Sequence, residues 1–202
     1  MSKKKLFYII FFSALVVGFF VIMSFIIPGF TKPGIPPISR VKPFSFVNQD
    51  GQAVTEKSLE GKVAVVEYFF TTCKGICPRL NNNLRTVYNE FKNQKDFIIL
   101  SHTSDPQTDS ATRLKQFADS MRVDTKKWIF LTGKKDSLYA MARYSYKIDD
   151  PANNPQNADD DFLHTQFIAL VNKKGDVIKI YDGLKQSEMS EMKKKIAELL
   201  KK

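Results

Sequence analysis

The sequence is short of cysteine and histidine, and it has no internal repeat. Two cysteines among 202 residues are too few for a fold held together by disulfides, and a chain of this length buries an adequate core without them. The lack of a repeat excludes solenoid and propeller architectures. The two cysteines must therefore be explained by where they stand in the chain.

Charge is missing altogether from residues 6–27. A helix of that length spans roughly 33 Å at about 1.5 Å per residue, which is enough for a bilayer core of ~30 Å. The basic flank 1–5 carries Lys3, Lys4 and Lys5, and such flanks stay in the cytoplasm. We therefore predict a single-pass transmembrane anchor over 6–27, with the remainder of the chain on the outer face of the membrane.

A cleaved signal peptide is the competing interpretation of this segment. Signal peptides have a shorter apolar core and a small-x-small cleavage site, whereas Ile27 is followed by Pro28, Gly29 and Phe30. The segment also lacks the Arg- and Ser-rich character of a mitochondrial leader. An uncleaved anchor in a bacterial inner membrane is preferred, with the soluble domain in the periplasm.

The net charge of +10 raises the question of a nucleic-acid partner. Much of the charge lies in lysines near the C-terminus, which is typical of a solvated helix face. A domain outside the cytoplasm does not meet nucleic acid. We expect no such partner, although a basic surface favours contact with anionic lipid or an acidic protein.

The remaining chain divides into a spacer, residues 28–43, and a folded domain, residues 44–202. Proline and glycine make the spacer extended and semi-stiff. The domain begins with a hairpin at 44–55, turning at Asp50-Gly51. Strands are then predicted at 63–70, 97–100 and 128–131, helices at 76–91, after 109 and around 138–146, a polar loop at 149–161, a hairpin from 166–171 and 177–181, and a closing helix. This order predicts a thioredoxin-like α/β fold with a mixed sheet flanked by helices.

Both cysteines lie in TTCKGICP, between the first long strand and its helix. If helical geometry begins near Gly75, the sulfurs of Cys73 and Cys77 lie about one turn apart on one side. Such a pair can chelate one metal ion, and it is marginally close enough for a disulfide. The helix N-terminus is expected to lower both thiol pKa values. Two purely structural cysteines are a weaker alternative, because both stand at a strand-to-helix turn.

A metal site also needs a third ligand, and the chain has two histidines. His164 opens the late hairpin, which starts near the N-terminus of the first long helix in a thioredoxin-like sheet. His102 ends the second parallel strand at the cysteine edge of the sheet, so it is kept as the alternative. Two thiolates and one imidazole suit Cu(I), or Cu(II) with an added oxygen, whereas structural zinc prefers a fourth protein ligand. We predict one copper ion per chain.

The segments FFTTCKGICP, TSDPQTD and HTQFIALVNKKG together resemble the Sco/SenC family of copper chaperones, over about residues 43–200. The resemblance implies copper ligands at Cys73, Cys77 and His164. It also implies a role in assembling the dinuclear copper centre of cytochrome c oxidase in the respiratory chain. Asp105, in the DP turn, is implied to support the site without binding metal.

The sequence departs from that family at two positions. Lys74 stands where many relatives have proline, and a cation there is expected to lower the thiol pKa further. His102 stands where many relatives have a small or aliphatic residue, which leaves room for a secondary metal contact.

Two functions from different classes follow. The preferred one is a binding and transfer protein rather than an enzyme. Its partners are the copper-site subunit of the oxidase and an upstream copper donor or thiol reductant. The alternative is a thiol–disulfide oxidoreductase that keeps the oxidase cysteines reduced, with Cys73 and Cys77 as the redox pair and Cys73 as the attacking sulfur. A peroxidase-like enzyme with Arg79 as the activating residue fits the cysteine spacing poorly.

Overall fold

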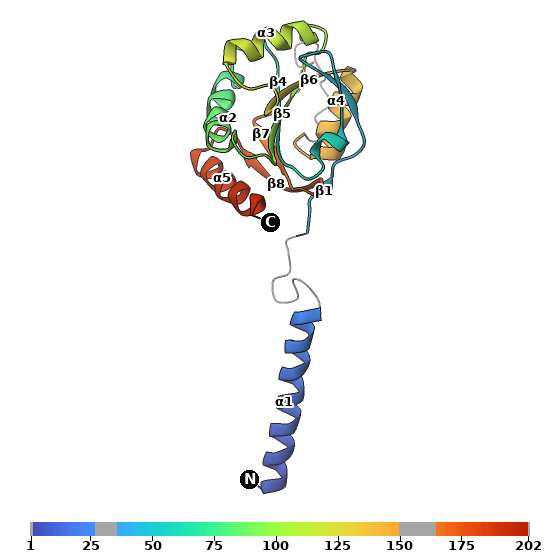
Figure 1. Cartoon of the computed structure of the whole chain (residues 1–202), viewed down its shortest axis with the longest axis vertical. Helices are drawn as coiled ribbons and strands as arrows, with labels where there is room; N and C mark the ends of the chain where they lie inside the picture. Colours follow the sequence, from blue (N-terminus) through green and yellow to red (C-terminus); the bar gives the residue numbers. More distant parts are fainter. Residues whose placement is uncertain (1, 27–35, 150–164, 202) are drawn as a thin grey trace. The chain divides into compact units, whose positions relative to one another are not determined.

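The computed structural model describes residues 2–26, 36–149 and 165–201 (Figure 1). The chain divides into two compact units, Met1–Pro36 and Pro37–Lys202. The first unit consists of helix α1 (Lys3–Ile26), which buries none of its side chains. Its 24 residues, with a mean hydropathy of 2.8 over an 18-residue window, make it long and apolar enough to cross a membrane. Ile27 and most of the predicted spacer lie outside the described residues.

In the described part of the second unit, eight strands form one mixed sheet in the order β1-β8-β7-β4-β5-β6-β2-β3. The three central strands, β4, β5 and β6, run parallel, and the outer strands pair antiparallel. The strands are β1 (Ser39–Arg40), β2 (Ser45–Asn48), β3 (Ala53–Thr55), β4 (Val63–Phe69), β5 (Phe97–Thr103), β6 (Trp128–Thr132), β7 (Phe167–Val171) and β8 (Asp176–Asp182). The predicted thioredoxin-like mixed sheet is confirmed.

Helices cover both faces of this sheet (Figure 1). One face carries α2 (Cys77–Phe91), α3 (Ala111–Met121) and α5 (Gln186–Leu200). The other carries α4 (Lys135–Ala140), its π-helical continuation η2 (Met141–Tyr146) and the short 3-10 turn η1 (Glu56–Leu59). Each face has its own apolar core, and strand residues alternate between the two cores. The α2 face holds Val65 and Phe69, while the α4 face holds Val66 and Tyr68.

Three local features differ from the sequence expectations. Strand β5 continues three residues past Leu100 to Thr103, because its parallel pairing with β4 runs on to Phe69↔Thr103. Strand β1 forms within the expected spacer, where Ser39 pairs with Val177 of β8. The helix expected around 138–146 changes from α to π geometry at Met141.

Candidate metal and thiol site

The cysteines lie where strand β4 passes into helix α2. Helical backbone angles begin at Ile76 and helix α2 at Cys77, which agrees with the expected start near Gly75, and Cys73 belongs to the preceding loop. A turn still folds Cys73 back, since its backbone N–H donates to the carbonyl of Phe70 at 3.2 Å. Pro78 occupies the first helical turn, where its missing N–H needs no partner. Both cysteines are free thiols, and their side chains are hydrogen-bonded to each other.

The two thiols differ in their surroundings. Cys77 is 6% exposed, and burial raises the pKa of its thiol well above the usual range, with a hydrogen bond from the Cys77 thiol to Cys73 adding to the rise. The expectation that the helix N-terminus lowers both thiol pKa values is therefore wrong for Cys77, because desolvation outweighs the helix dipole. Cys73 is only partly buried, so it is the more accessible sulfur, and the neighbouring Lys74 is exposed.

His164 lies outside the described residues. Within the described ranges, no group of three or more His, Cys, Asp or Glu side chains gathers into a metal-binding cluster. The antiparallel register Val66↔Ala169 places the start of β7 beside the end of β4. Strand β7 therefore begins at the edge of the sheet from which the cysteine loop leaves.

His102 lies on the wrong side of the sheet for a role at the thiols. It follows Ile98 and Leu100, which belong to the α4-side core, whereas Cys77 belongs to the α2-side core. Its ring stacks on Tyr68 with centroids 5.0 Å apart, and it is completely buried. The alternatives that His102 completes the metal site or makes a secondary metal contact are therefore wrong.

The buried imidazole is poorly satisfied. Neither ring nitrogen of His102 has a hydrogen-bond partner among the described residues. Phe44, Phe46 and Tyr146 complete its aromatic surroundings. Burial lowers its pKa to about 3, so the ring is neutral at physiological pH.

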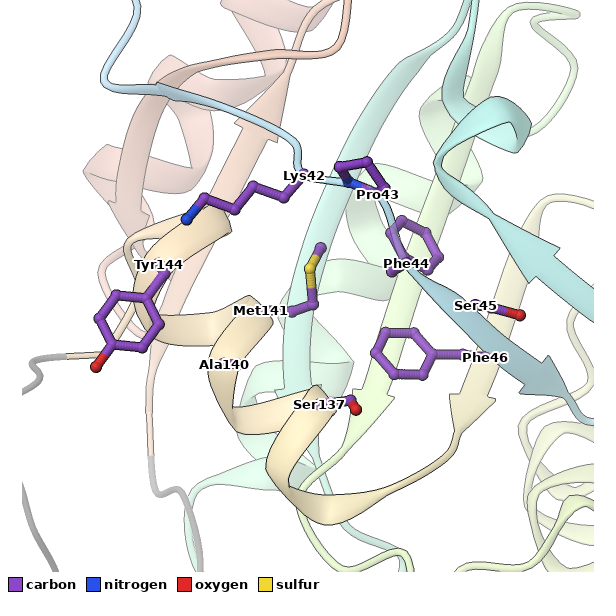
Figure 2. Close-up of a pocket in the computed structure, with 9 residues that line it drawn as sticks. All are labelled: Lys42, Pro43, Phe44, Ser45, Phe46, Ser137, Ala140, Met141 and Tyr144. Atoms are coloured by element: carbon purple, nitrogen blue, oxygen red, sulfur yellow. The ribbon is translucent and has the colours of Figure 1, made fainter.

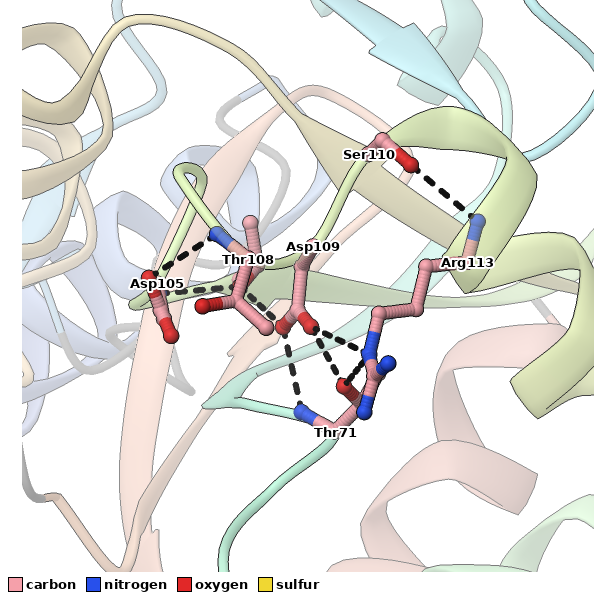
Figure 3. A network of polar contacts seen from close by, with 7 residues as sticks. Thr71, Asp105, Thr108, Asp109, Ser110 and Arg113 are labelled. Carbon is pink, nitrogen blue, oxygen red and sulfur yellow. Dashed lines mark hydrogen bonds and ion pairs between the residues drawn. The ribbon is translucent and has the colours of Figure 1, made fainter.

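A buried aspartate holds the start of the cysteine loop (Figure 3). Asp109 is fully buried, and its carboxylate accepts hydrogen bonds from the backbone N–H of Thr71 at 3.1 Å and from the Thr71 hydroxyl at 2.5 Å. The Thr103 hydroxyl at the end of β5 donates to the same carboxylate at 2.6 Å. Arg113 lies 3.7 Å from it and donates to Thr71 at 2.6 Å. Asp109 thus fixes a residue two positions before Cys73.

The sequence analysis predicted a helix after residue 109 but gave Asp109 no role at the cysteine loop. Ser110 is the actual cap of α3, since its hydroxyl accepts from the Arg113 backbone N–H at 3.3 Å. The sequence does place an acid immediately before the cap, and a fully buried carboxylate demands partners. That signal alone does not say which loop supplies them.

Asp105 organises its own turn. Its carboxylate accepts from the backbone N–H of Thr108 at 3.2 Å, and its own N–H donates to the Thr103 hydroxyl at 2.9 Å. No hydrogen bond joins Asp105 to either thiol among the described contacts. Its supporting role stays a prediction, with Thr103 as the link towards Asp109.

Two further features lie apart from the thiols. A pocket of about 500 Å³ opens between the chain around Phe44 and helix α4, with Met141 and Tyr144 among its lining residues (Figure 2). Neither Cys73 nor Cys77 is among its described lining residues. Arg79 is exposed in the first turn of α2, and it forms no hydrogen bond or ion pair with a described residue.

Comparison with known proteins identifies the family of this fold and thiol pair. The sequence profile of the SCO1/SenC family matches residues 35–201. The chain belongs to the SCO1/SenC family. The SCO1 protein homolog of Bacillus subtilis is 33% identical over 149 residues, covering 73% of this chain and 76% of that protein. The predicted family resemblance is confirmed.

Solved structures agree with this assignment. A SCO1/SenC family lipoprotein from Bacillus anthracis superposes with a TM-score of 0.70 at 26% identity, covering 82% of this chain and 98% of its own. BsSco is described as a member of the Sco family of cytochrome c oxidase assembly proteins with a disulfide switch. It superposes with a TM-score of 0.68 at 28% identity, covering 82% of this chain and 96% of its own. Arabidopsis thaliana ScoI, solved with copper bound, shares the fold with a TM-score of 0.63 at 24% identity, covering 81% of this chain and 99% of its own.

Proposed function

We propose that this protein is a membrane-anchored metallochaperone for the dinuclear copper centre of cytochrome c oxidase. It carries one copper ion, as Cu(I) or Cu(II), on Cys73, Cys77 and His164, and passes it to the copper-site subunit of the oxidase. The observation that carries the proposal is the pair of free, mutually hydrogen-bonded thiols at the β4–α2 junction of a chain that belongs to the SCO1/SenC family.

The chemistry of the donors supports copper. Two thiols and an imidazole are soft enough to prefer Cu(I). The β4–β7 register brings the start of β7, at Phe167, to the edge of the sheet at which the cysteine loop lies. In the sequence, His164 stands three residues before Phe167. Because Cys77 is buried and Cys73 is more accessible, the partner's ligand attacks copper from the Cys73 side during transfer.

We assign the protein to the bacterial inner membrane, with α1 as the single-pass anchor and the domain in the periplasm. The length and hydropathy of α1, together with the lysines that precede its apolar part, support this arrangement.

Copper titration of the full chain in detergent tests the ligand set. Wild type should bind one copper ion per chain, and Cys77→Ser and His164→Ala should weaken binding by more than the roughly 10–100-fold that loss of a supporting residue costs. His102→Phe is the matched control, because it removes the only other histidine from the opposite core. Unchanged affinity in His164→Ala would remove that residue from the site.

A second function, thiol–disulfide exchange with the oxidase cysteines, is favoured by the unequal burial of the pair. An accessible Cys73 suits the attacking sulfur, and a buried Cys77 suits the resolving one. Reduction of a peptide disulfide by the His164→Ala variant, with copper removed by a chelator, separates the two functions. Full activity in that variant supports exchange independent of copper, and loss of activity contradicts it.

A further inference from the structure

The edge of the sheet opposite the cysteine loop is rich in positive charge. Four loops lie at this edge, because they precede β4, β5 and β6 or join β7 to β8, whereas the cysteine loop follows β4. Together they hold eight basic and four acidic residues, and no role proposed so far uses them. We call this surface the lysine edge, and it comprises residues 60–62, 92–96, 122–127 and 172–176.

Hydrogen bonds hold these loops side by side. The backbone N–H of Gly61 donates to the carbonyl of Lys173 at 3.0 Å, and the Lys173 ammonium lies 3.2 Å from the carboxylate of Asp96. The Lys127 ammonium donates to the carbonyl of Gln94 at 2.6 Å. Each of the four loops contributes to these contacts, so they form one continuous surface.

The acids of the lysine edge do not cancel its charge. Asp96 is paired with Lys173, and Asp176 lies 3.7 Å from Arg40, which leaves two exposed acids against five exposed bases. Within the described ranges none of the five bases is in an ion pair. Lysine carries a compact charge on a flexible stem with three donors, which suits the oxygens of a phosphate. The five are Lys92, Lys95, Arg122, Lys126 and Lys174.

The chain from helix α1 enters the domain beside this edge. The backbone N–H of Val41 donates to the carbonyl of Gly175 at 2.9 Å, and the domain begins four residues earlier, at Pro37. Only ten residues lie between Pro37 and Ile26, the last residue of α1, and they reach at most ~40 Å at full extension. The covalent link therefore keeps the lysine edge close to any membrane that holds α1.

We propose that the lysine edge binds the headgroups of anionic phospholipids in the membrane that holds α1. The inference rests on the membrane anchoring proposed above. The tether supplies a high effective concentration of headgroups, which favours lipid over an acidic protein from solution. Each lysine near an anionic surface strengthens the attraction about fivefold.

Lipid binding at this edge would set the direction in which the thiols face. The seven residues of β4 extend for about 23 Å, and they separate the lysine edge from the loop that carries Cys73. Headgroups bound at one end of the strand leave the cysteine loop at the other end, facing away from the bilayer. A partner protein can then reach Cys73 without competing with the membrane.

Energy transfer from Trp128 to a dansyl-labelled headgroup lipid tests the proposal. Trp128 is the single tryptophan of the chain and follows Lys127 of the lysine edge, so it is a native donor at this surface. The full chain is reconstituted in vesicles of phosphatidylcholine, or of equal parts phosphatidylcholine and phosphatidylglycerol, each with the same trace of labelled lipid. Transfer should be higher in the anionic vesicles, and it should fall to the neutral level at about 1 M salt, where the screening length is ~3 Å.

The variant Lys95→Gln/Lys126→Gln/Lys174→Gln removes three exposed charges of the lysine edge. The ratio of docked to free domain should fall on the order of 100-fold, which removes the difference between the two lipids. The matched control removes the same charge at the starts of α3, α4 and α5, beside the cysteine edge, and it should behave like wild type. This control is Lys115→Gln/Lys134→Gln/Lys185→Gln.

Three results would contradict the proposal in different ways. Equal transfer from wild type in both lipids would overturn lipid binding and leave an acidic protein as the partner of this surface. An equal loss in the control variant would show that net charge attracts the lipid, without a role for the lysine edge. Release of the chain from the vesicles by alkaline carbonate would instead overturn the membrane anchor, and the inference with it.

Discussion

Replacing His102 by Phe should make the protein more resistant to acid. The imidazole is fully buried among four aromatic rings, those of Phe44, Phe46, Tyr68 and Tyr146. Its two nitrogens have no partner among the described residues. Phenylalanine keeps an aromatic ring of similar shape and removes both polar atoms, so the core should accept it with little rearrangement.

The expected size follows from the pKa of the imidazole, which burial lowers from 6.5 to about 3. A group with a depressed folded-state pKa destabilises the fold when the unfolded chain takes up its proton first. The contribution of neutral His102 to the free energy of unfolding is therefore complete above pH 6.5, and it is lost as the pH falls towards 3. At about 1.36 kcal/mol per pKa unit, wild type should lose roughly 2.7 kcal/mol from this residue by pH 4.5 and on the order of 5 kcal/mol by pH 3. The phenylalanine variant should lose none of it.

Urea unfolding of the fragment 37–202, which contains both core clusters, measures this difference. Trp128 is the single tryptophan of the chain and is fully buried, so its fluorescence reports unfolding. At pH 7 the variant should equal wild type or exceed it by about 1 kcal/mol, because unsatisfied buried polar atoms are costly. His164→Ala as the background removes the other histidine. Parallel stability curves for the two proteins between pH 6.5 and 4.5 would refute the buried, neutral state of His102.

Two further predictions concern the cysteine loop and its support. Asp109→Asn removes the carboxylate that accepts three hydrogen bonds, so copper affinity measured by competition with a chelator should fall roughly 10-fold; Asp119→Asn, at an exposed acid in the helix α3 that follows Asp109, should leave it unchanged. Gly183→Ala would place a Cβ 2.2 Å from a methyl carbon of Leu80, so urea unfolding should show a loss of about 1–3 kcal/mol, whereas Gly75→Ala, with open space around it, should not.

Most of the fold could be predicted because strand and helix patterns alternate clearly. The apolar run of β4 and the helical spacing of Leu80, Leu84 and Val87 are local signals, and their order determines a parallel centre with an antiparallel hairpin. Strand β1 was not predicted, because Ser39 and Arg40 carry no strand pattern and pair only through backbone hydrogen bonds with β8. The end of β5 was placed too early, because polar residues can be buried when a neighbouring strand supplies partners.

The site could be predicted only in part. The thiol pair is visible in the spacing of Cys73 and Cys77, and both are where the sequence places them, at the β4–α2 junction. The spacing does not reveal that Cys77 is buried enough to raise its pKa. His102 was misplaced because the predicted strand stopped at Leu100; once β5 continues to Thr103, alternation places His102 on the same face as Ile98 and Leu100. Asp109 and Glu67 were missed because their hydrogen-bond partners come from distant segments.

Glu67 and His102, on opposite faces of adjacent strands, should together give the protein a stability maximum in mild acid. The pKa of Glu67 is raised from 4.5 to about 8, so its contribution is complete below pH 4.5 and is lost as the pH rises towards 8. The contribution of His102 is lost in the opposite direction, from 6.5 towards 3. Between pH 4.5 and 6.5 the two slopes cancel. The double variant Glu67→Gln/His102→Phe should therefore exceed wild type by a constant ~2.7 kcal/mol from this linkage, rising to about 5 kcal/mol at pH 3 and at pH 8. A difference that stays the same from pH 3 to pH 8, measured by urea unfolding of fragment 37–202, would show that both groups titrate in the folded protein as they do in the unfolded chain.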